Sequence, residues 1–444
     1  MRFLGVRCKL SFVEFLRKTV RSEKGFWALG DQALLSLSNF ALMFLAARFL
    51  VPFDFGLFSL LYSLLLLGLN IQAGILLDPL VVLLPRYSNE DAQGYVSSAI
   101  WQQLLLSVVL VCLVFLGFWG QELLPIGEES FDSVTAVALA YGLFFYQVHE
   151  FFRRLLFQAV LIKAIFVTDT VGHLVRFGFL VSLLQQDQLN ISNLLFLIGH
   201  GFLVSALLQG LVAFRKFEWG FKLKLWAWSD NWQQGRWLLS TNLLVWGVAH
   251  AYLFILAKLL GAEEAGALRA VQTLFGPLTM MLLAADNLGA VLAARRYKAQ
   301  GPKGLAAFMK HFVWLLLGVG APYCFVMMLF GDELLGLFYR QQYRGLFVAI
   351  VFVGCTQIVG LIGRAPGIGL RVLLVPGKVF RAYVISGLVV LVTAYPLVEA
   401  FQINGATFGT LISSLATVFV LALVYFQTIK KKIKADKYKY SVNL

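Results

Sequence analysis

The sequence is short of charged residues, and this shortage limits what kind of protein it can encode. Only 14% of its 444 residues are charged, whereas 60% are hydrophobic. The apolar residues form runs of roughly 20 with few interruptions, a length that matches the hydrocarbon core of a bilayer. A water-soluble globular fold is therefore excluded. We expect an all-α polytopic membrane protein, because helices satisfy their own backbone hydrogen bonds in lipid.

Cysteine is also scarce, and two common motifs are missing. The four cysteines are widely spaced and form no CxxC pair, which excludes a disulfide framework. No cluster of histidine, cysteine and carboxylate residues has the spacing of metal ligands, so we expect neither a metal nor a cofactor. The sequence also lacks a GxxxxGK[ST] phosphate-binding loop, and hydrolysis of ATP by this chain is not expected.

The apolar runs, divided at charged residues and turn residues, predict about twelve transmembrane helices. The expected ranges are 26–47, 57–84, 98–119, 133–151, 155–184, 193–213, 237–257, 267–294, 306–330, 346–362, 382–398 and 407–427.

Lysine and arginine are distributed unevenly between the two sides of the predicted spans. Only Arg48, Lys258, Arg340 and Arg344 fall in the loops on one side of the membrane, the side opposite the two tails. Nearly all the other lysines and arginines lie in the tails and in the loops on the same side as the tails. Since cytoplasmic loops carry the excess of basic residues, both termini are predicted to be cytoplasmic. This asymmetry explains the net charge of +14 without an anionic polymer, and no nucleic-acid partner is expected.

The second half of the sequence repeats the first half 210 positions later. The pairs that carry the comparison are Trp27 with Trp237, Arg48 with Lys258, Gly56 with Gly266, Arg86 with Arg296 and Tyr87 with Tyr297. An even number of predicted helices separates the two copies, so both halves enter the membrane from the same side. We therefore expect two parallel six-helix bundles around a central cavity, able to expose that cavity to each side in turn.

The predicted chain falls into five segments. These are a cytoplasmic basic amphipathic N-terminal segment (1–25), an N-terminal six-helix bundle (26–213), a cytoplasmic linker (214–236), a C-terminal six-helix bundle (237–427) and a basic cytoplasmic tail (428–444).

Three stretches resemble a known family. They are LAARFLVPFDFGLFSL at 45–60, HEFFRRLLFQ at 149–158, expected at the junction of the fourth and fifth helices, and INGATFGTLISS at 403–414. They are similar to the polysaccharide transporters, the oligosaccharide flippases of the multidrug/oligosaccharidyl-lipid/polysaccharide exporter superfamily. The resemblance implies a twelve-helix fold in the bacterial plasma membrane. It also implies movement of a polyprenyl-diphosphate-linked glycan to the outer leaflet, with membrane lipids and glycan polymerases or glycosyltransferases as partners.

Two other functions compete with that of a flippase. A proton- or sodium-coupled multidrug exporter of the sister family would share the repeat and stays the alternative. A membrane enzyme would need a large outward loop with paired carboxylates, and Glu128–Glu129 is the one candidate pair. The chain is therefore expected not to be an enzyme.

The fifth predicted helix carries the strongest group of candidate site residues. Asp169, His173 and Arg176 are spaced i, i+4 and i+7, which places them on one face near mid-span. A charge in the membrane needs a partner or a wet cavity. In one interpretation Arg176 contacts the diphosphate of the substrate, while Asp169 or His173 accepts a coupling proton. In the other, an ion pair within this face locks the helix against a neighbour.

Further substrate-binding candidates lie on other predicted helices. Arg48, Lys258 and Arg269 stand at outer helix ends, where they either receive a phosphate or extend toward the interface. Asn39 and Asn70 form part of polar stripes, which either line the cavity or join helices within the bilayer.

Three acidic residues are candidates for ion coupling. Asp31, Asp78 and Asp286 are predicted near the cytoplasmic ends of their helices. A carboxylate in such a position can bind a proton or sodium ion, but it can also simply be hydrated there.

Overall fold

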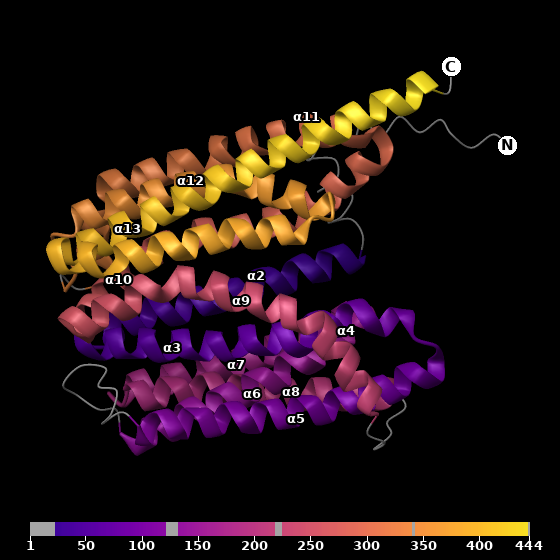
Figure 1. Cartoon of the computed structure of the whole chain (residues 1–444). Coiled ribbons are helices and arrows are strands. Elements are labelled where there is room, and N and C mark those ends of the chain that lie inside the picture. Colours follow the sequence, from indigo (N-terminus) through magenta and orange to yellow (C-terminus); the bar gives the residue numbers. More distant parts are fainter. Residues whose placement is uncertain (1–22, 121–131, 218–223, 340–341, 443–444) are drawn as a thin grey trace.

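The computed structural model describes residues 23–120, 132–217, 224–339 and 342–442, and within these ranges the chain forms helices and no β-strand. The helices lie side by side along one common direction (Figure 1). The first described helix begins and the last one ends on the same side, which we call the terminal side; the opposite side is the distal side. Most of the predicted N-terminal segment 1–25 lies outside the described residues.

The first half contains seven α-helices with two irregular turns. They are α2 (Glu23–Phe49), α3 (Pro52–Gln72), the π-helical turn η1 (Ala73–Leu77), α4 (Asp78–Leu83), the 3-10 turn η2 (Leu84–Arg86), α5 (Asn89–Trp119), α6 (Ser133–Gln158), α7 (Ile162–Gln185) and α8 (Ile191–Lys216). The second half contains α9 (Leu225–Leu260), α10 (Ala262–Leu274), α11 (Gly276–Phe338), α12 (Phe347–Val372) and α13 (Pro376–Val442).

The described helices account for the twelve predicted spans. Nine of them are long and apolar enough to cross a membrane. Two of the nine, α11 and α13, each hold two spans, because the backbone leaves the helical conformation at Gly301 and at Gln402. Helix α6 has 26 residues, enough to span a bilayer, and charged residues near its end lower its hydropathy. The prediction of an all-α membrane protein with about twelve helices is confirmed.

The predicted cytoplasmic linker 214–236 was too long, because α9 begins at Leu225. The first turns of α9 bury Ala227, Asn231 and Gly235, which are spaced i, i+4 and i+8. One narrow face of the helix therefore packs against the first half. The many polar residues on the other faces hid this helix from a search for apolar runs.

The fourth predicted helix was too short for a related reason. HEFFRRLLFQ belongs to α6, which continues to Gln158, and the turn to α7 follows at 159–161. Its charged residues, which suggested a loop, are instead held inside the bundle by partners on other helices.

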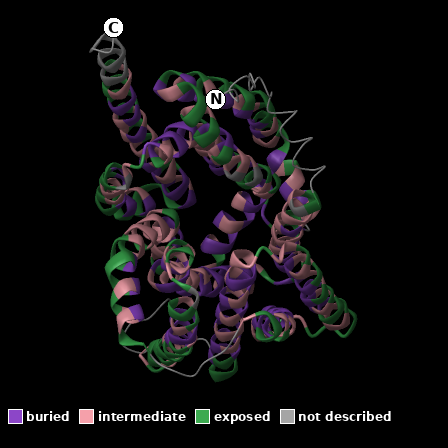
Figure 2. Cartoon of the chain, turned by 90° about the vertical axis from the view of Figure 1, so that its right-hand side faces the viewer, coloured by how far each residue is buried: buried purple, intermediate pink, exposed green. Residues whose placement is uncertain are grey.

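The two halves touch through glycines at both sides of the membrane. Toward the distal side, a Cβ atom on Gly56 of α3 would lie 1.7 Å from the main-chain oxygen of Ala262 in α10, and one on Gly266 would lie 2.8 Å from that of Pro52. Toward the terminal side, Gly74 of η1 meets the main chain of α9. Figure 2, which looks along the helices from the terminal side, shows buried residues between the helices and exposed ones around the perimeter.

Candidate functional site

A cluster of buried charges joins α2, α6 and α7 inside the first half. The Arg153 side chain of α6 donates to Asp31 of α2 at 2.6 Å, and its Nε lies 3.3 Å from a carboxylate oxygen of Asp169 on α7. Asp31 and Asp169 are each only 1% exposed. One guanidinium therefore bridges two buried carboxylates that are far apart in the sequence. We call Asp31, Arg153, Asp169 and His149 the charge cluster.

The remaining partners of the charge cluster come from α6 and α8. His149 lies one helical turn before Arg153, and its Nε2 is 2.7 Å from Asp169. Gln209 of α8 donates to the same carboxylate at 2.8 Å. Glu150, at the edge of the cluster, lies 3.7 Å from Arg153. The cluster and its partners thus join four helices, α2, α6, α7 and α8.

The structure separates Arg176 from Asp169, although both lie on the predicted face of α7. Arg176 is 1% exposed and donates a short hydrogen bond to Ser38 of α2, which also lies 3.0 Å from His173. No described carboxylate forms an ion pair with Arg176. The predicted locking pair within the helix face is therefore wrong, because Asp169 is engaged by Arg153 instead. The described neighbours of the Arg176 guanidinium include the Ser38 hydroxyl and the rings of Phe177 and Phe202.

A second arginine without a carboxylate partner lies where the halves meet. Arg269 of α10 donates to Ser63 of α3 at 2.7 Å and to Gln272 at 3.1 Å. Tyr62 lies in the electrostatic field of both Arg176 and Arg269. We call Arg176, Tyr62 and Arg269 the arginine pair with its tyrosine. Arg269 is partly exposed as a whole residue, although its Nε is buried without a hydrogen-bond partner, as is the Nε of Arg176.

Arg48 and Lys258, which are equivalent in the repeat, have different surroundings. Arg48 donates to the carbonyl oxygen of Phe338 at 3.0 Å, at the last residue of α11. This bond satisfies one of the carbonyl groups that a helix end leaves without a partner. Lys258 is exposed and has no partner among the described residues. The two do not form one site in this conformation.

The two candidate asparagines lie outside the charge cluster. The side-chain amide of Asn70 donates to the main-chain oxygen of Leu66 in the same helix at 2.8 Å. The main-chain oxygen of Asn70 accepts from the side-chain amide of Asn242 in α9 at 3.5 Å. Asn39 is half-buried on α2, one residue after Ser38. Neither contacts the charge cluster.

The other acidic candidates, Asp286 and Asp78, have different surroundings. Asp286 of α11 forms a short ion pair with Arg364 of α12, and both side chains are about a fifth to a quarter exposed (19% and 26%). Asp78 is half-buried at the start of α4 and forms no ion pair with another described residue. Asp31 was predicted near a hydrated helix end, and this prediction is wrong. Helix α2 packs Asp31 into the bundle, where it pairs with Arg153.

Sequence reasoning missed three residues that complete the cluster: His149, Arg153 and Gln209. The first two lie in HEFFRRLLFQ, which was interpreted as a junction. Their spacing of i and i+4 on a helix that ends in apolar residues was the available signal. Gln209 gave none. Among the residues that the structure describes, no group of three or more His, Cys, Asp or Glu side chains could hold a metal ion.

Tyr87, between the spans on the terminal side, marks a polar contact between the halves. Its hydroxyl donates to Asp230 of α9 at 2.7 Å, and its ring packs on Trp226. Burial and the Asp230 carboxylate raise the pKa of Tyr87 above its ordinary value, so the phenol stays protonated and keeps donating.

Comparisons with known proteins agree with this architecture. The sequence profile of the family described as MatE matches residues 238–349, the first part of the second half. An inward-facing multidrug resistance MATE family transporter of the MOP superfamily superposes with a TM-score of 0.73 at 14% identity, covering 95% of this chain and 99% of that one. The chain has the MATE transporter fold.

Two further solved structures share this fold. An outward-facing MATE family transporter superposes with a TM-score of 0.69 at 12% identity, covering 94% of this chain and 96% of that one. The lipid II flippase MurJ in an inward closed conformation gives a TM-score of 0.64 at 12% identity, over 97% and 93% of the two chains. No curated protein matches the sequence.

Proposed function

We propose that this chain is a membrane transporter that moves a lipid-linked oligosaccharide or polysaccharide precursor from the cytoplasmic to the outer leaflet by alternating access. In this proposal it works in a bacterial plasma membrane with both termini in the cytoplasm. Glycan polymerases or glycosyltransferases make or use the transported precursor. The chain itself carries out no chemical reaction.

The observation that carries this proposal is the arginine pair with its tyrosine. Arg269 and Arg176 are cations without a described carboxylate partner in the membrane part of the protein. A charge in that position is costly, and an anionic ligand would offset the cost. Arginine binds phosphate oxygens through two parallel hydrogen bonds, so a diphosphate is the matching chemistry.

The position of Arg269 also suits a substrate that passes between the halves. Its hydrogen bond to Ser63 joins α10 of the second half to α3 of the first half. A diphosphate that competes for this guanidinium would weaken that link and favour separation of the two helices. One of the solved structures with this fold is a flippase for lipid II, which agrees with a lipid-linked substrate.

The test is flipping by the purified chain in liposomes that contain a polyprenyl-diphosphate oligosaccharide, followed by access of an added glycosidase. We expect Arg269→Gln to slow flipping by about tenfold or more and Arg269→Lys to slow it less, since a point charge remains. Lys310→Gln, which removes an exposed positive charge elsewhere, serves as the control. Flipping by Arg269→Gln at the rate of the unchanged chain would disprove the assignment.

The charge cluster favours a second candidate function, a proton- or sodium-coupled exporter. Asp31 and Asp169 share the single guanidinium of Arg153, so the buried carboxylates outnumber the permanent cations. A proton or a sodium ion would neutralise the excess charge, and its release would change how α2, α6 and α7 are held together.

This second function has its own experiment. Asp169→Asn removes the excess carboxylate, and we expect transport to lose its dependence on a proton or sodium gradient. Asp286→Asn, at the partly exposed pair with Arg364, should keep that dependence. Export of cationic drugs by the unchanged chain, together with no flipping of the glycan lipid, would favour the exporter over the flippase.

A further inference from the structure

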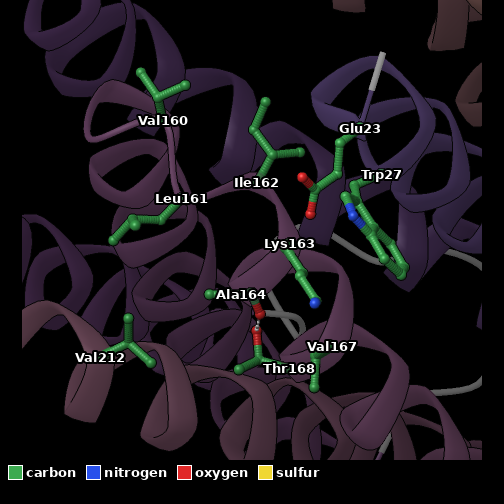
Figure 3. A pocket seen from close by; sticks show the side chains of 10 residues that line it. All are labelled: Glu23, Trp27, Val160, Leu161, Ile162, Lys163, Ala164, Val167, Thr168 and Val212. Atoms are coloured by element: carbon green, nitrogen blue, oxygen red, sulfur yellow. Dashed lines mark hydrogen bonds between the residues drawn. The ribbon is translucent and has the colours of Figure 1, made fainter. Parts of the chain in front are cut away.

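A pocket of about 570 Å³ opens on the terminal side of the first half; Thr168, the residue before Asp169, lines it, but no member of the charge cluster or of the arginine pair does. It lies between the start of α2, the turn from α6 to α7 and the end of α8 (Figure 3). Val160, Val167 and Val212 form its apolar walls, and Glu23, Trp27 and Lys163 supply its polar groups.

The apolar walls continue onto a surface that faces lipid. Val167, Val171 and Leu174 follow one another along α7 and are 48%, 37% and 67% exposed. On a membrane-spanning helix such a face contacts acyl chains. The pocket therefore begins where a bilayer chain already lies, and a chain can enter it without crossing a polar surface.

The polar groups of the pocket are not paired with one another. Lys163 Nζ lies 5.5 Å from the centre of the Trp27 ring, and no described carboxylate is within ion-pair distance of it. The indole Nε1 of Trp27 is buried and has no hydrogen-bond partner. Figure 3 shows Glu23, Trp27 and Lys163 grouped on one side of the pocket, opposite Val160 and Val212. Among the described residues, the Lys163 ammonium and the Glu23 carboxylate thus have no ion-pair partner, and the buried indole N–H of Trp27 has no acceptor.

We propose that this pocket binds a phospholipid with a primary ammonium headgroup, such as phosphatidylethanolamine, from the leaflet on the terminal side. Lys163 and Trp27 donate to the phosphate, and Glu23 accepts from the ammonium. An acyl chain lies against Val167 and Val212. A single positive and a single negative group match this zwitterion better than a headgroup with net negative charge.

The bound lipid would brace the helices that hold the charge cluster. Thr168 lines the pocket, and its hydroxyl accepts from Gln209 at 3.2 Å. Gln209 in turn donates to Asp169 at 2.8 Å. A lipid that bridges α2 and α7 at the pocket therefore stabilises the same two helices that meet again at the charge cluster.

The experiment measures thermal unfolding of the full chain in detergent as phosphatidylethanolamine is added, with phosphatidylcholine and phosphatidylglycerol of the same acyl chains in parallel. We expect phosphatidylethanolamine to raise the unfolding temperature most. Lys163→Gln should weaken its apparent affinity by about fivefold, the equivalent of about 1 kcal/mol for one basic residue at a membrane surface. Glu23→Gln should remove the preference over phosphatidylcholine, whose headgroup has no N–H to donate.

Two more variants separate the pocket from the general surface. Val167→Trp changes an exposed side chain and fills the pocket, so it should reduce the effect of all three lipids. Lys310→Gln, an exposed lysine of α11 outside the pocket, should change nothing.

Three results would overturn the proposal. They are equal stabilisation by the three lipids, an effect of Lys163→Gln no larger than that of Lys310→Gln, or the same stabilisation by soluble phosphoethanolamine. The measurement uses no transported substrate, so its failure would leave the proposed flippase function untouched.

Discussion

The two halves of the chain share a fold but differ in what they bury. The first half buries a dense set of charged and ionisable side chains, namely Asp31, His149, Arg153, Asp169, His173 and Arg176. In the second half, the buried polar residues of the described part are uncharged: Asn231, Thr273, Ser386, Thr407, Ser413 and Thr428. The duplication therefore preserved the helical frame, while the interior chemistry became different in each half.

Because of this difference, the stability of each half depends on its ion pairs to a different degree. The principal ion pair of the second half, Asp286 with Arg364, remains partly in contact with solvent. The charge cluster of the first half is almost completely enclosed. A buried ion pair is costly to break, since the remaining partner is left uncompensated, whereas a partly exposed pair contributes little.

The largest expected effect comes from breaking the buried pair. Arg153→Met leaves Asp31 and Asp169 without their shared cation, so we expect the free energy of unfolding to fall by about 3–5 kcal/mol. Arg364→Met, in the second half, should cost about 1 kcal/mol or less. Thermal or denaturant unfolding in detergent measures both. Equal losses for the two variants would show that the halves do not differ in this respect.

A medium effect is expected where the halves are alike. Gly56→Ala and Gly266→Ala each place a methyl group into the contact between α3 and α10, and each should cost about 1–3 kcal/mol. Gly117→Ala is the control, because a Cβ there meets nothing within 4 Å. The unfolding temperatures of the three variants test this symmetry. A large loss at one of the two contact glycines and none at the other would contradict it.

The smallest effect concerns Arg48 and Lys258, which the repeat makes equivalent. Arg48→Met removes the hydrogen bond to the end of α11 and should cost about 1 kcal/mol. Lys258→Met removes only an exposed charge and should leave stability unchanged within error. If both variants lower the unfolding temperature equally, the two side chains have the same role and the contrast between them is wrong.

The fold was predictable from the sequence because the length of an apolar run is a property of one segment, and the repeat needs only a comparison of two segments. Gly56 and Gly266, which were paired from the sequence alone, meet in the structure as well. The failures came at polar helix segments. Residues 225–236 and the end of α6 are helical because other helices supply their partners, and no pattern within one segment reveals those partners.

The candidate site was predictable only in part for the same reason. The spacing of Asp169, His173 and Arg176 predicted one shared face of the helix, and the structure buries all three residues in α7. Their pairing depends on α2, α6 and α8, from residues 20 to 138 positions away. Arg176 therefore has a hydroxyl partner instead of the carboxylate on its own helix.

The contact between Gly56 and Gly266 has a consequence for the entropy cost of the proposed cycle. At these two glycines the nearest atoms of the opposite helix are main-chain atoms. Closing an interface of long side chains restricts their rotamers, at a cost of up to about 2 kcal/mol for each. The main-chain part of this contact avoids that entropy loss on closing, so the side-chain cost of joining α3 and α10 falls on other positions, such as the hydrogen bond from Arg269 to Ser63.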